Sequence, residues 1–234
     1  MEAGHPNYET EEVARRRRRV VVVAGVTGAG LLGFSLSSEP GSRRFYLSSL
    51  GVAATWVAGG LSSGPLHLGR MRLGERELGR PISKPIALGG AAFGAFYGAA
   101  LLARRVPVLD RWLHSVLRYA HEGPSSALLA TTLVNGAAEE VFFRGAVFAA
   151  VPADRAVVAS TGAYVAATAA TRNPALIFAS AVMGTLFGMQ RRATGGIQAP
   201  ILTHLTWSGL MLRFLPPLFR RTAAAEGMRT SDAH

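Results

Sequence analysis

The stretch Ala137-Ala-Glu-Glu-Val-Phe-Phe-Arg-Gly145 places three charged side chains inside an otherwise apolar run. Each charge at the centre of a membrane-spanning helix costs roughly 2.5–3.5 kcal/mol on insertion scales. In a helix, Glu140 and Arg144 stand one turn apart on one face, so they can form an ion pair. Glu139 lies off that line and needs water, a donor from another helix or a proton. This pattern predicts a functional site within a membrane.

The composition of the whole chain is typical of a membrane protein. Its 234 residues are 49% apolar, with 27 glycines and a mean hydropathy of +0.25. These values favour one helical membrane domain over a soluble protein. The chain has no cysteine, which excludes disulfides, thiolate metal ligands and a cysteine nucleophile. The net charge of +11 comes from arginines that flank the apolar runs, so we expect contact with the lipid bilayer and its anionic headgroups rather than with nucleic acid.

Hydropathy predicts an all-α fold, a polytopic membrane helical bundle of about seven transmembrane helices plus an interfacial amphipathic helix. Residues 104–122 mix apolar side chains at helical spacing with charges and histidines, as expected for the interfacial helix. In the third span, Gly90, Gly94 and Gly98 recur along one face and predict close helix packing. The expected spans are 20–37, 45–62, 86–103, 126–151, 156–170, 175–189 and 197–215.

The charges between these spans predict how the chain is oriented. Arg15 to Arg19 directly precede the first span, which favours a cytoplasmic N-terminus. No convincing small-residue cleavage site follows that span, so it is expected to remain uncleaved. The chain is therefore predicted to be an integral membrane protein of a bacterial-type plasma membrane. Its predicted parts are a cytoplasmic basic tail (1–19), a transmembrane helical domain (20–217) and a polar C-terminal tail (218–234).

A second ionisable side chain, His204, lies in the last apolar run. Pro200 is suited to a helix start, which places the imidazole about one turn into the helix and near one membrane face. Ser208 follows one turn later on the same side. A single buried histidine is usually a satisfied core residue. Together with Glu139 and Glu140 in one small bundle, however, His204 predicts a shared site.

Two carboxylates and an imidazole in a dry, helix-walled cavity support few reactions. A carboxylate can take a proton from water while a histidine stabilises the oxyanion, which hydrolyses an amide without a covalent intermediate. The same groups could hold a divalent metal, although no His-Glu-x-x-His pair is present. Two weaker interpretations are a serine protease that uses Ser160 with His204, and a transporter, for which no inverted repeat is visible.

The two charged motifs resemble those of the CPBP intramembrane proteases, a family that includes the CAAX prenyl proteases and bacteriocin-processing or immunity proteins. The family's first motif, Glu-Glu-x-x-x-Arg, matches residues 139–144, with the usual Gly145 after it. Its last motif, a histidine after a small-Pro-apolar lead, matches residues 199–204. The run Gly184-Thr-Leu-Phe-Gly188 also looks like the family's connection. The resemblance covers about residues 126–212 and implies a divergent member of the family.

The resemblance implies a role for each matching residue. Glu139 would be the general base for water, Glu140 with Arg144 a structural pair or second acid, and His204 the oxyanion stabiliser or a metal ligand. A metal such as zinc is possible by this resemblance, and the residues alone leave it unknown. The implied substrate is a hydrophobic or lipidated peptide, including a prenylated one, whose peptide bond is hydrolysed by water activated by Glu139.

Two positions depart from the family pattern. The middle motif, Phe-x-x-x-His, falls on Tyr164-Val-Ala-Ala-Thr168, and Ser208 stands where the last motif has asparagine or aspartate. Threonine neither accepts a proton at neutral pH nor binds zinc as imidazole does. Two interpretations stay open. One is an endopeptidase in which Thr168 positions water for Glu139, and the other is a catalytically degenerate member that binds membrane peptides or acts as a scaffold or immunity protein.

Overall fold

A computed structural model describes residues 11–72, 78–122 and 125–217. Within these residues the chain forms eight α-helices, a π-helical segment and a two-stranded antiparallel hairpin, so the fold is all-α in class. The elements are α1 (Glu11–Ser35), α2 (Arg43–Ser62), β1 (Met71–Arg72), β2 (Leu78–Gly79), α3 (Ser83–Ala103), α4 (Pro107–Glu122), α5 (Ser125–Glu139), the π-helical segment η1 (Glu140–Val147), α6 (Ala156–Ala169), α7 (Pro174–Thr194) and α8 (Gln198–Phe214). Residues 1–10 of the predicted basic tail and the predicted C-terminal tail lie outside the described residues.

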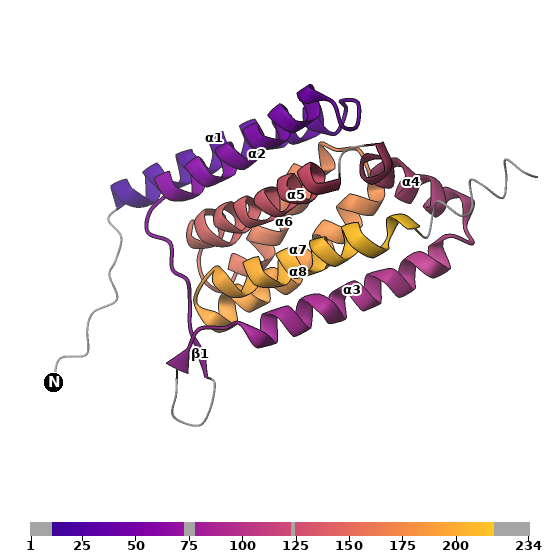
Figure 1. Cartoon of the computed structure of the whole chain (residues 1–234). Coiled ribbons are helices and arrows are strands. Elements are labelled where there is room, and N and C mark those ends of the chain that lie inside the picture. The colour runs from indigo at the N-terminus through magenta and orange to yellow at the C-terminus, as the bar shows by residue number, and fades with distance from the viewer. Residues whose placement is uncertain (1–10, 73–77, 123–124, 218–234) are drawn as a thin grey trace, which may run out of the picture.

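Helices α5 to α8 form the middle of the bundle (Figure 1). Helices α1 and α2 pack against each other on one side, and α2 contacts α5 and η1. Helix α3 lies on the opposite side and packs on α8. The amphipathic helix α4 lies at one end of the bundle, and the β1–β2 hairpin lies at the other. Each predicted span therefore corresponds to a helix, and the interfacial segment forms a separate helix between α3 and α5.

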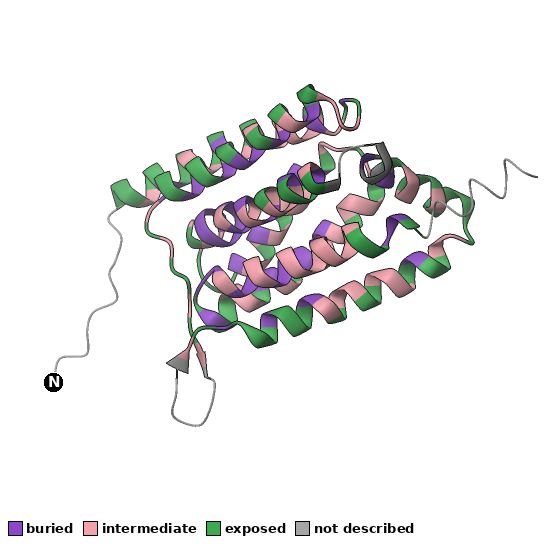
Figure 2. Cartoon of the chain, in the orientation of Figure 1, coloured by how far each residue is buried: buried purple, intermediate pink, exposed green. Residues whose placement is uncertain are grey.

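Many large apolar side chains are exposed on the outer faces of the bundle. Figure 2 shows exposed residues along the outer sides of α1 and α3. Among the described helices, these two are long and apolar enough to cross a membrane. A soluble monomer rarely leaves so much apolar surface open to water. Together these features indicate a membrane location. Large apolar side chains that are at least 60% exposed include Val22, Val23, Val26, Leu61, Leu102, Val158 and Phe178.

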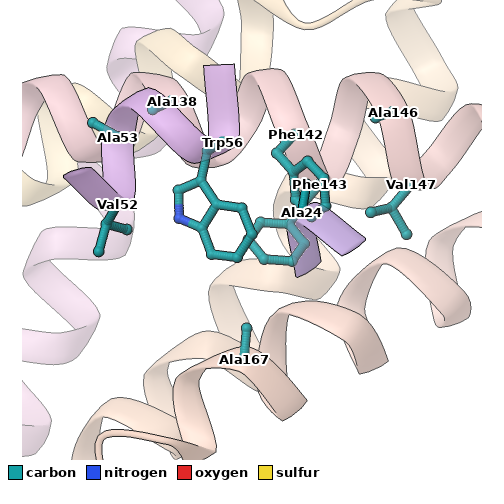
Figure 3. Packing of buried hydrophobic residues seen from close by; sticks show 10 residues of the cluster. All are labelled: Ala24, Val52, Ala53, Trp56, Ala138, Phe142, Phe143, Ala146, Val147 and Ala167. Atoms are coloured by element: carbon teal, nitrogen blue, oxygen red, sulfur yellow. The ribbon is translucent and has the colours of Figure 1, made fainter. Parts of the chain in front are cut away.

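An aromatic core joins η1 to the first two helices (Figure 3). Trp56 of α2 is fully buried and stacks on Phe142 with ring centroids 4.6 Å apart, and Phe143 lies 5.1 Å from the same indole. Gly28 of α1 faces this indole, and a Cβ there would overlap the ring. Between membrane helices such close packing replaces the hydrophobic effect as the main attraction. The core therefore fixes the position of the charged motif against α1 and α2.

The predicted packing face of the third span is wrong. A Cβ at Gly90, Gly94 or Gly98 would meet no atom within 4 Å, so these glycines face away from the other helices. The close approach is made by Gly89, where a Cβ would lie 2.8 Å from the Thr203 carbonyl oxygen of α8. Glycine spacing identifies a face of a helix, but it does not show which face meets a neighbour.

Two helices extend further than the hydropathy pattern predicts. Helix α1 begins at Glu11, inside the predicted basic tail, and Arg17 is buried there. Its guanidinium donates hydrogen bonds to the carbonyl oxygens of Ser63, at 2.9 Å, and Ala149, at 3.0 Å. Helix α7 continues to Thr194, beyond residue 189, where the predicted span ends. It ends where Gly195 adopts a φ of +72°, a conformation that glycine reaches without strain.

Candidate active site

The charged motif lies where the helix changes its hydrogen-bonding pattern. Glu139 is the last residue of α5, and Glu140 opens the π-helical segment η1. Residues 126–151 were expected to form one regular helix, so this change is a correction. A π-helical turn holds more residues than an α-helical turn, is rare, and occurs often at functional sites. Arg191 of α7 donates a 2.9 Å hydrogen bond from Nε to the Arg144 carbonyl oxygen and ties the segment to its neighbour.

Glu140 and Arg144 form a fully buried ion pair. Glu140 Oε1 accepts a 3.0 Å hydrogen bond from Arg144 Nη1 and lies 2.9 Å from His204 Nδ1. The other guanidinium nitrogen, Nη2, donates to the Gly184 carbonyl oxygen at 3.0 Å. Such a pair stabilises mainly by keeping each charge compensated, because removing one partner leaves the other buried alone. The pair links η1, α7 and α8 at the base of the site.

Small residues allow this close assembly. A Cβ at Gly184 would lie 3.2 Å from Arg144 Nη2, so glycine leaves room for the guanidinium. Phe187, one turn later on α7, stacks on the His204 imidazole with ring centroids 4.8 Å apart and planes 22° apart. On the other side, a Cβ at Gly136 of α5 would lie 3.4 Å from the same imidazole. His204 is therefore held between α5 and α7 while Glu140 fixes its Nδ1.

Glu139 takes its partners from other helices. Its Oε2 accepts a 2.7 Å hydrogen bond from the Tyr164 hydroxyl of α6 and lies 4.0 Å from His204 Nε2 of α8. Its side chain is 14% exposed, whereas that of Glu140 is fully buried. Asn135, one turn earlier, donates to the Thr131 carbonyl oxygen instead. The two adjacent carboxylates thus differ: Glu140 is enclosed, and Glu139 faces a space.

That space is a cavity of about 320 Å³. Its polar end is lined by five side chains from three helices, α5, α6 and α8: Glu139, Tyr164, Thr168, His204 and Ser208. From there it runs between apolar side chains to the end of the bundle where α4 lies. The apolar part is lined by residues that include Leu36, Phe45, Leu117, Leu128, Met211 and Leu215. The structure therefore brings Glu139, His204, Thr168 and Ser208 to one cavity and places Glu140 and Arg144 behind it.

Residues 122–210 match the family model of type II CAAX prenyl endopeptidase Rce1-like proteins. This part of the chain is an Rce1-like domain of the CPBP family. It contains all the residues of the polar end and the buried Glu140–Arg144 pair. No curated protein and no solved structure matches the chain. The resemblance drawn from the two motifs is therefore confirmed for the part of the chain that carries them.

The serine-protease interpretation does not fit the Rce1-like domain. Ser160 is fully buried and donates its hydroxyl to the Phe143 carbonyl oxygen at 2.8 Å. It is not among the residues that line the cavity with His204. Ser160 therefore bonds α6 to η1 and is not placed to act as a nucleophile.

The middle motif of the Rce1-like domain contains Tyr164, a site residue that the sequence alone did not identify. Thr168 is buried in the cavity wall, and its hydroxyl donates to the Tyr164 carbonyl oxygen at 2.8 Å. The hydroxyl proton of Thr168 is thus engaged in a hydrogen bond within α6. Tyr164 makes the contact with Glu139. The feature of the sequence that could have identified it is the tyrosine at the position where the family's motif begins with phenylalanine.

The donor set of the Rce1-like domain does not fit zinc. Within residues 11–72, 78–122 and 125–217, no three histidine, aspartate or glutamate side chains are grouped to hold a metal ion. Glu140 Oε1 is engaged by both Arg144 and His204. Thr168 supplies only a neutral hydroxyl where an imidazole ligand would stand. The groups at this site that can act on a substrate are therefore its side chains and water.

Proposed function

We propose that the chain is an intramembrane endopeptidase of the CPBP type, which hydrolyses a peptide bond of a membrane-associated or prenylated substrate. The observation that carries the proposal is the approach of two reactive groups from separate helices. Glu139 Oε2 and His204 Nε2 lie 4.0 Å apart at the polar end of one cavity. The Rce1-like domain supports the reaction class, and the long apolar part of the cavity suits a hydrophobic or lipidated peptide.

We propose that α1, α2, α3, α5 with η1, α6, α7 and α8 are seven membrane spans. Helix α4 lies in the interface, where Trp112 is exposed on its apolar side and His114 pairs with Asp110 at 3.9 Å. The arginine run 15–19 places the N-terminus in the cytoplasm of a bacterial-type cell and brings it against anionic lipid headgroups. The apolar outer faces of α1 and α3 support this arrangement.

In the proposed reaction, Glu139 acts as the general base. It takes a proton from a water molecule in the cavity while the water oxygen attacks the scissile carbonyl carbon. In this step His204 carries a proton on both ring nitrogens: Nε2–H donates a hydrogen bond to the developing oxyanion, and Nδ1–H donates to Glu140, which holds the imidazole in that orientation. Glu139 then passes its proton to the leaving nitrogen as the C–N bond breaks. Arg144 bonds to Glu140 and holds it in place without touching the substrate.

A second candidate function is a peptide-binding or scaffold protein, such as an immunity protein, without turnover. Thr168 favours it, because a hydroxyl replaces the family's imidazole at a position in the cavity wall. General acid–base assistance is worth about 10²–10⁴-fold in rate, so its loss at this position could abolish a detectable rate. The two functions share one cavity and differ only in whether a bound peptide is cut.

A peptidase assay in detergent distinguishes these functions. Wild type, Glu139→Ala and Glu39→Ala are incubated with prenylated and unprenylated peptides, and products are measured by mass spectrometry. Glu39 is an exposed carboxylate in the α1–α2 loop and serves as the matched control. If the chain is a protease, the wild type and Glu39→Ala are expected to cleave the peptide, and Glu139→Ala is expected to lose this activity. Equal turnover by all three eliminates the protease, and binding without turnover selects the scaffold.

A further inference from the structure

We infer that Tyr164 positions the general base in a domain that lacks the family's middle histidine, because its phenol contacts Glu139 and holds this carboxylate where it can take a proton from water. Tyr164 is thus a positioning residue, since it acts through Glu139 rather than on the substrate. The inference rests on the proposed peptidase function and deepens it. It explains how a domain with threonine in place of that histidine keeps an ordered general base.

The first support is the geometry at Glu139. The phenol donates a 2.7 Å hydrogen bond to Glu139 Oε2, and both side chains line the polar end of the cavity. A hydrogen bond to a carboxylate is shorter and stronger than one between neutral groups. With Oε2 engaged by the phenol, Oε1 is the oxygen available to a water molecule in the cavity. The hydrogen bond therefore selects which oxygen acts as the base and fixes its direction.

The second support is that the phenol itself is held. The Arg144 guanidinium carbon lies 4.8 Å from the centre of the Tyr164 ring, a cation–π contact with a buried charge. The Phe143 ring packs on the same phenol at 4.9 Å. One turn later, the Thr168 hydroxyl bonds to the Tyr164 carbonyl oxygen at 2.8 Å. The ring and the backbone of Tyr164 are thus both fixed, which a positioning residue requires.

The third support is that the two departures from the family's middle motif compensate each other. Position 164 gains a hydroxyl where the motif has phenylalanine, and position 168 loses the imidazole. Thr168 cannot donate to Glu139 while its proton is used by the Tyr164 carbonyl oxygen. Within α6, the side chain that reaches Glu139 is therefore Tyr164 and not Thr168.

The reaction balances without a further reactant. One proton of water passes to Glu139 Oε1 as the C–O bond forms, and the same proton passes to the leaving nitrogen as the C–N bond breaks. Tyr164 keeps its proton throughout and remains bonded to Oε2. It is neither the acid nor the base of the reaction.

A double-mutant cycle at positions 164 and 168 tests the inference. Tyr164→Phe, Thr168→His and the double variant, which restores the family's Phe-x-x-x-His, are assayed beside wild type. Tyr97→Phe on α3, which is not among the residues lining the cavity, is the matched control. Tyr164→Phe is expected to lower kcat about tenfold or more with KM changed less than about twofold, since general-base catalysis depends on position. In the Thr168→His background, loss of the phenol is expected to change kcat less than about twofold.

The results distinguish the inference about Tyr164 from the proposed peptidase function. All rates are normalised to folded protein by gel filtration and thermal unfolding. Full activity of Tyr164→Phe, or an equal loss of kcat in both backgrounds, overturns the inference and leaves the peptidase intact. A wild type no more active than Glu139→Ala overturns the proposed function, and the inference with it. A loss of kcat on Tyr164→Phe that occurs with Thr168 and not with Thr168→His supports both the inference and the proposed function.

Discussion

The two ends of the cavity are built from different parts of the chain. At the polar end, every lining residue named above lies within the Rce1-like domain, and Glu139 of α5 contacts Tyr164 of α6 and His204 of α8. At the apolar end, Leu36 follows the end of α1, and Phe45 and Leu117 come from α2 and α4, all outside that domain. The difference teaches that the proposed reaction depends on residues of the Rce1-like domain, whereas the proposed recognition of substrate also draws on segments outside it. Variants at the two ends should therefore change different kinetic constants.

The sharpest test of the polar end is Glu139→Gln, which keeps the shape of the side chain and removes the base. We expect kcat to fall about 10²–10⁴-fold, because general-base assistance is lost. KM should stay close to the wild-type value, since the apolar end is untouched. Steady-state kinetics in detergent measure both constants, with Glu39→Gln as control. A Glu139→Gln variant with wild-type kcat and a raised KM would contradict the separation of the two ends.

The largest effect on stability is expected behind the polar end. Arg144→Met leaves Glu140 buried without its partner, and breaking such a pair costs about 3–5 kcal/mol. Thermal unfolding in detergent should show a drop in Tm of roughly 10 °C for a chain of this size. The double variant Glu140→Gln with Arg144→Met removes both charges and should recover part of the loss. A double variant less stable than Arg144→Met would contradict the ion-pair argument.

At the apolar end, Leu128→Trp is expected to act on binding. Leu128 is 6% exposed and lines the cavity, so the larger indole fills space that a substrate would occupy. We expect KM for a lipidated peptide to rise about tenfold, or about 1.4 kcal/mol, with kcat nearly unchanged. Leu102→Trp, on the outer side of α3 at 63% exposure, is the control. A loss of kcat alone would show that the two ends are not separable.

The smallest effect is expected from Gly136→Ala, where the new Cβ would lie 3.4 Å from the imidazole of His204. This is an ordinary contact distance, so the imidazole keeps its place and kcat should change by less than about threefold. Gly94→Ala on α3, where a Cβ meets nothing within 4 Å, should change neither kcat nor Tm. Loss of activity only in Gly136→Ala would show that His204 tolerates no displacement.

Much of the fold could be predicted from hydropathy. Every predicted span contains a helix, because long apolar runs of this kind have few other ways to satisfy their backbone in a membrane. The ion pair of Glu140 and Arg144 followed from helical spacing and the cost of buried charge. The approach of Glu139 to His204 was expected for the same reason, since an acid without a partner in its own helix needs a donor from another.

Other features depend on contacts that one sequence does not encode locally. The glycines at 90, 94 and 98 mark a face, but helix α8 meets the face that holds Gly89. The length of α7 is set by where Gly195 adopts a positive φ, while hydropathy falls at the arginines before it. The bond of Tyr164 to Glu139 joins α6 to α5, and only the rotation of both helices decides it.

The π-helical segment has a consequence for how the family's first motif can change. Its wider turn changes the rotational register of the residues that follow it, so they stand at an angle about the helix axis that a regular helix would not give them relative to Glu139. Deletion of Ala146 would let the helix tighten and rotate the residues that follow it relative to Glu139 and Arg144. Length, and not only chemistry, is therefore under constraint here, and insertions or deletions should be tolerated less in η1 than in the loops that the structure describes, such as the one between α1 and α2.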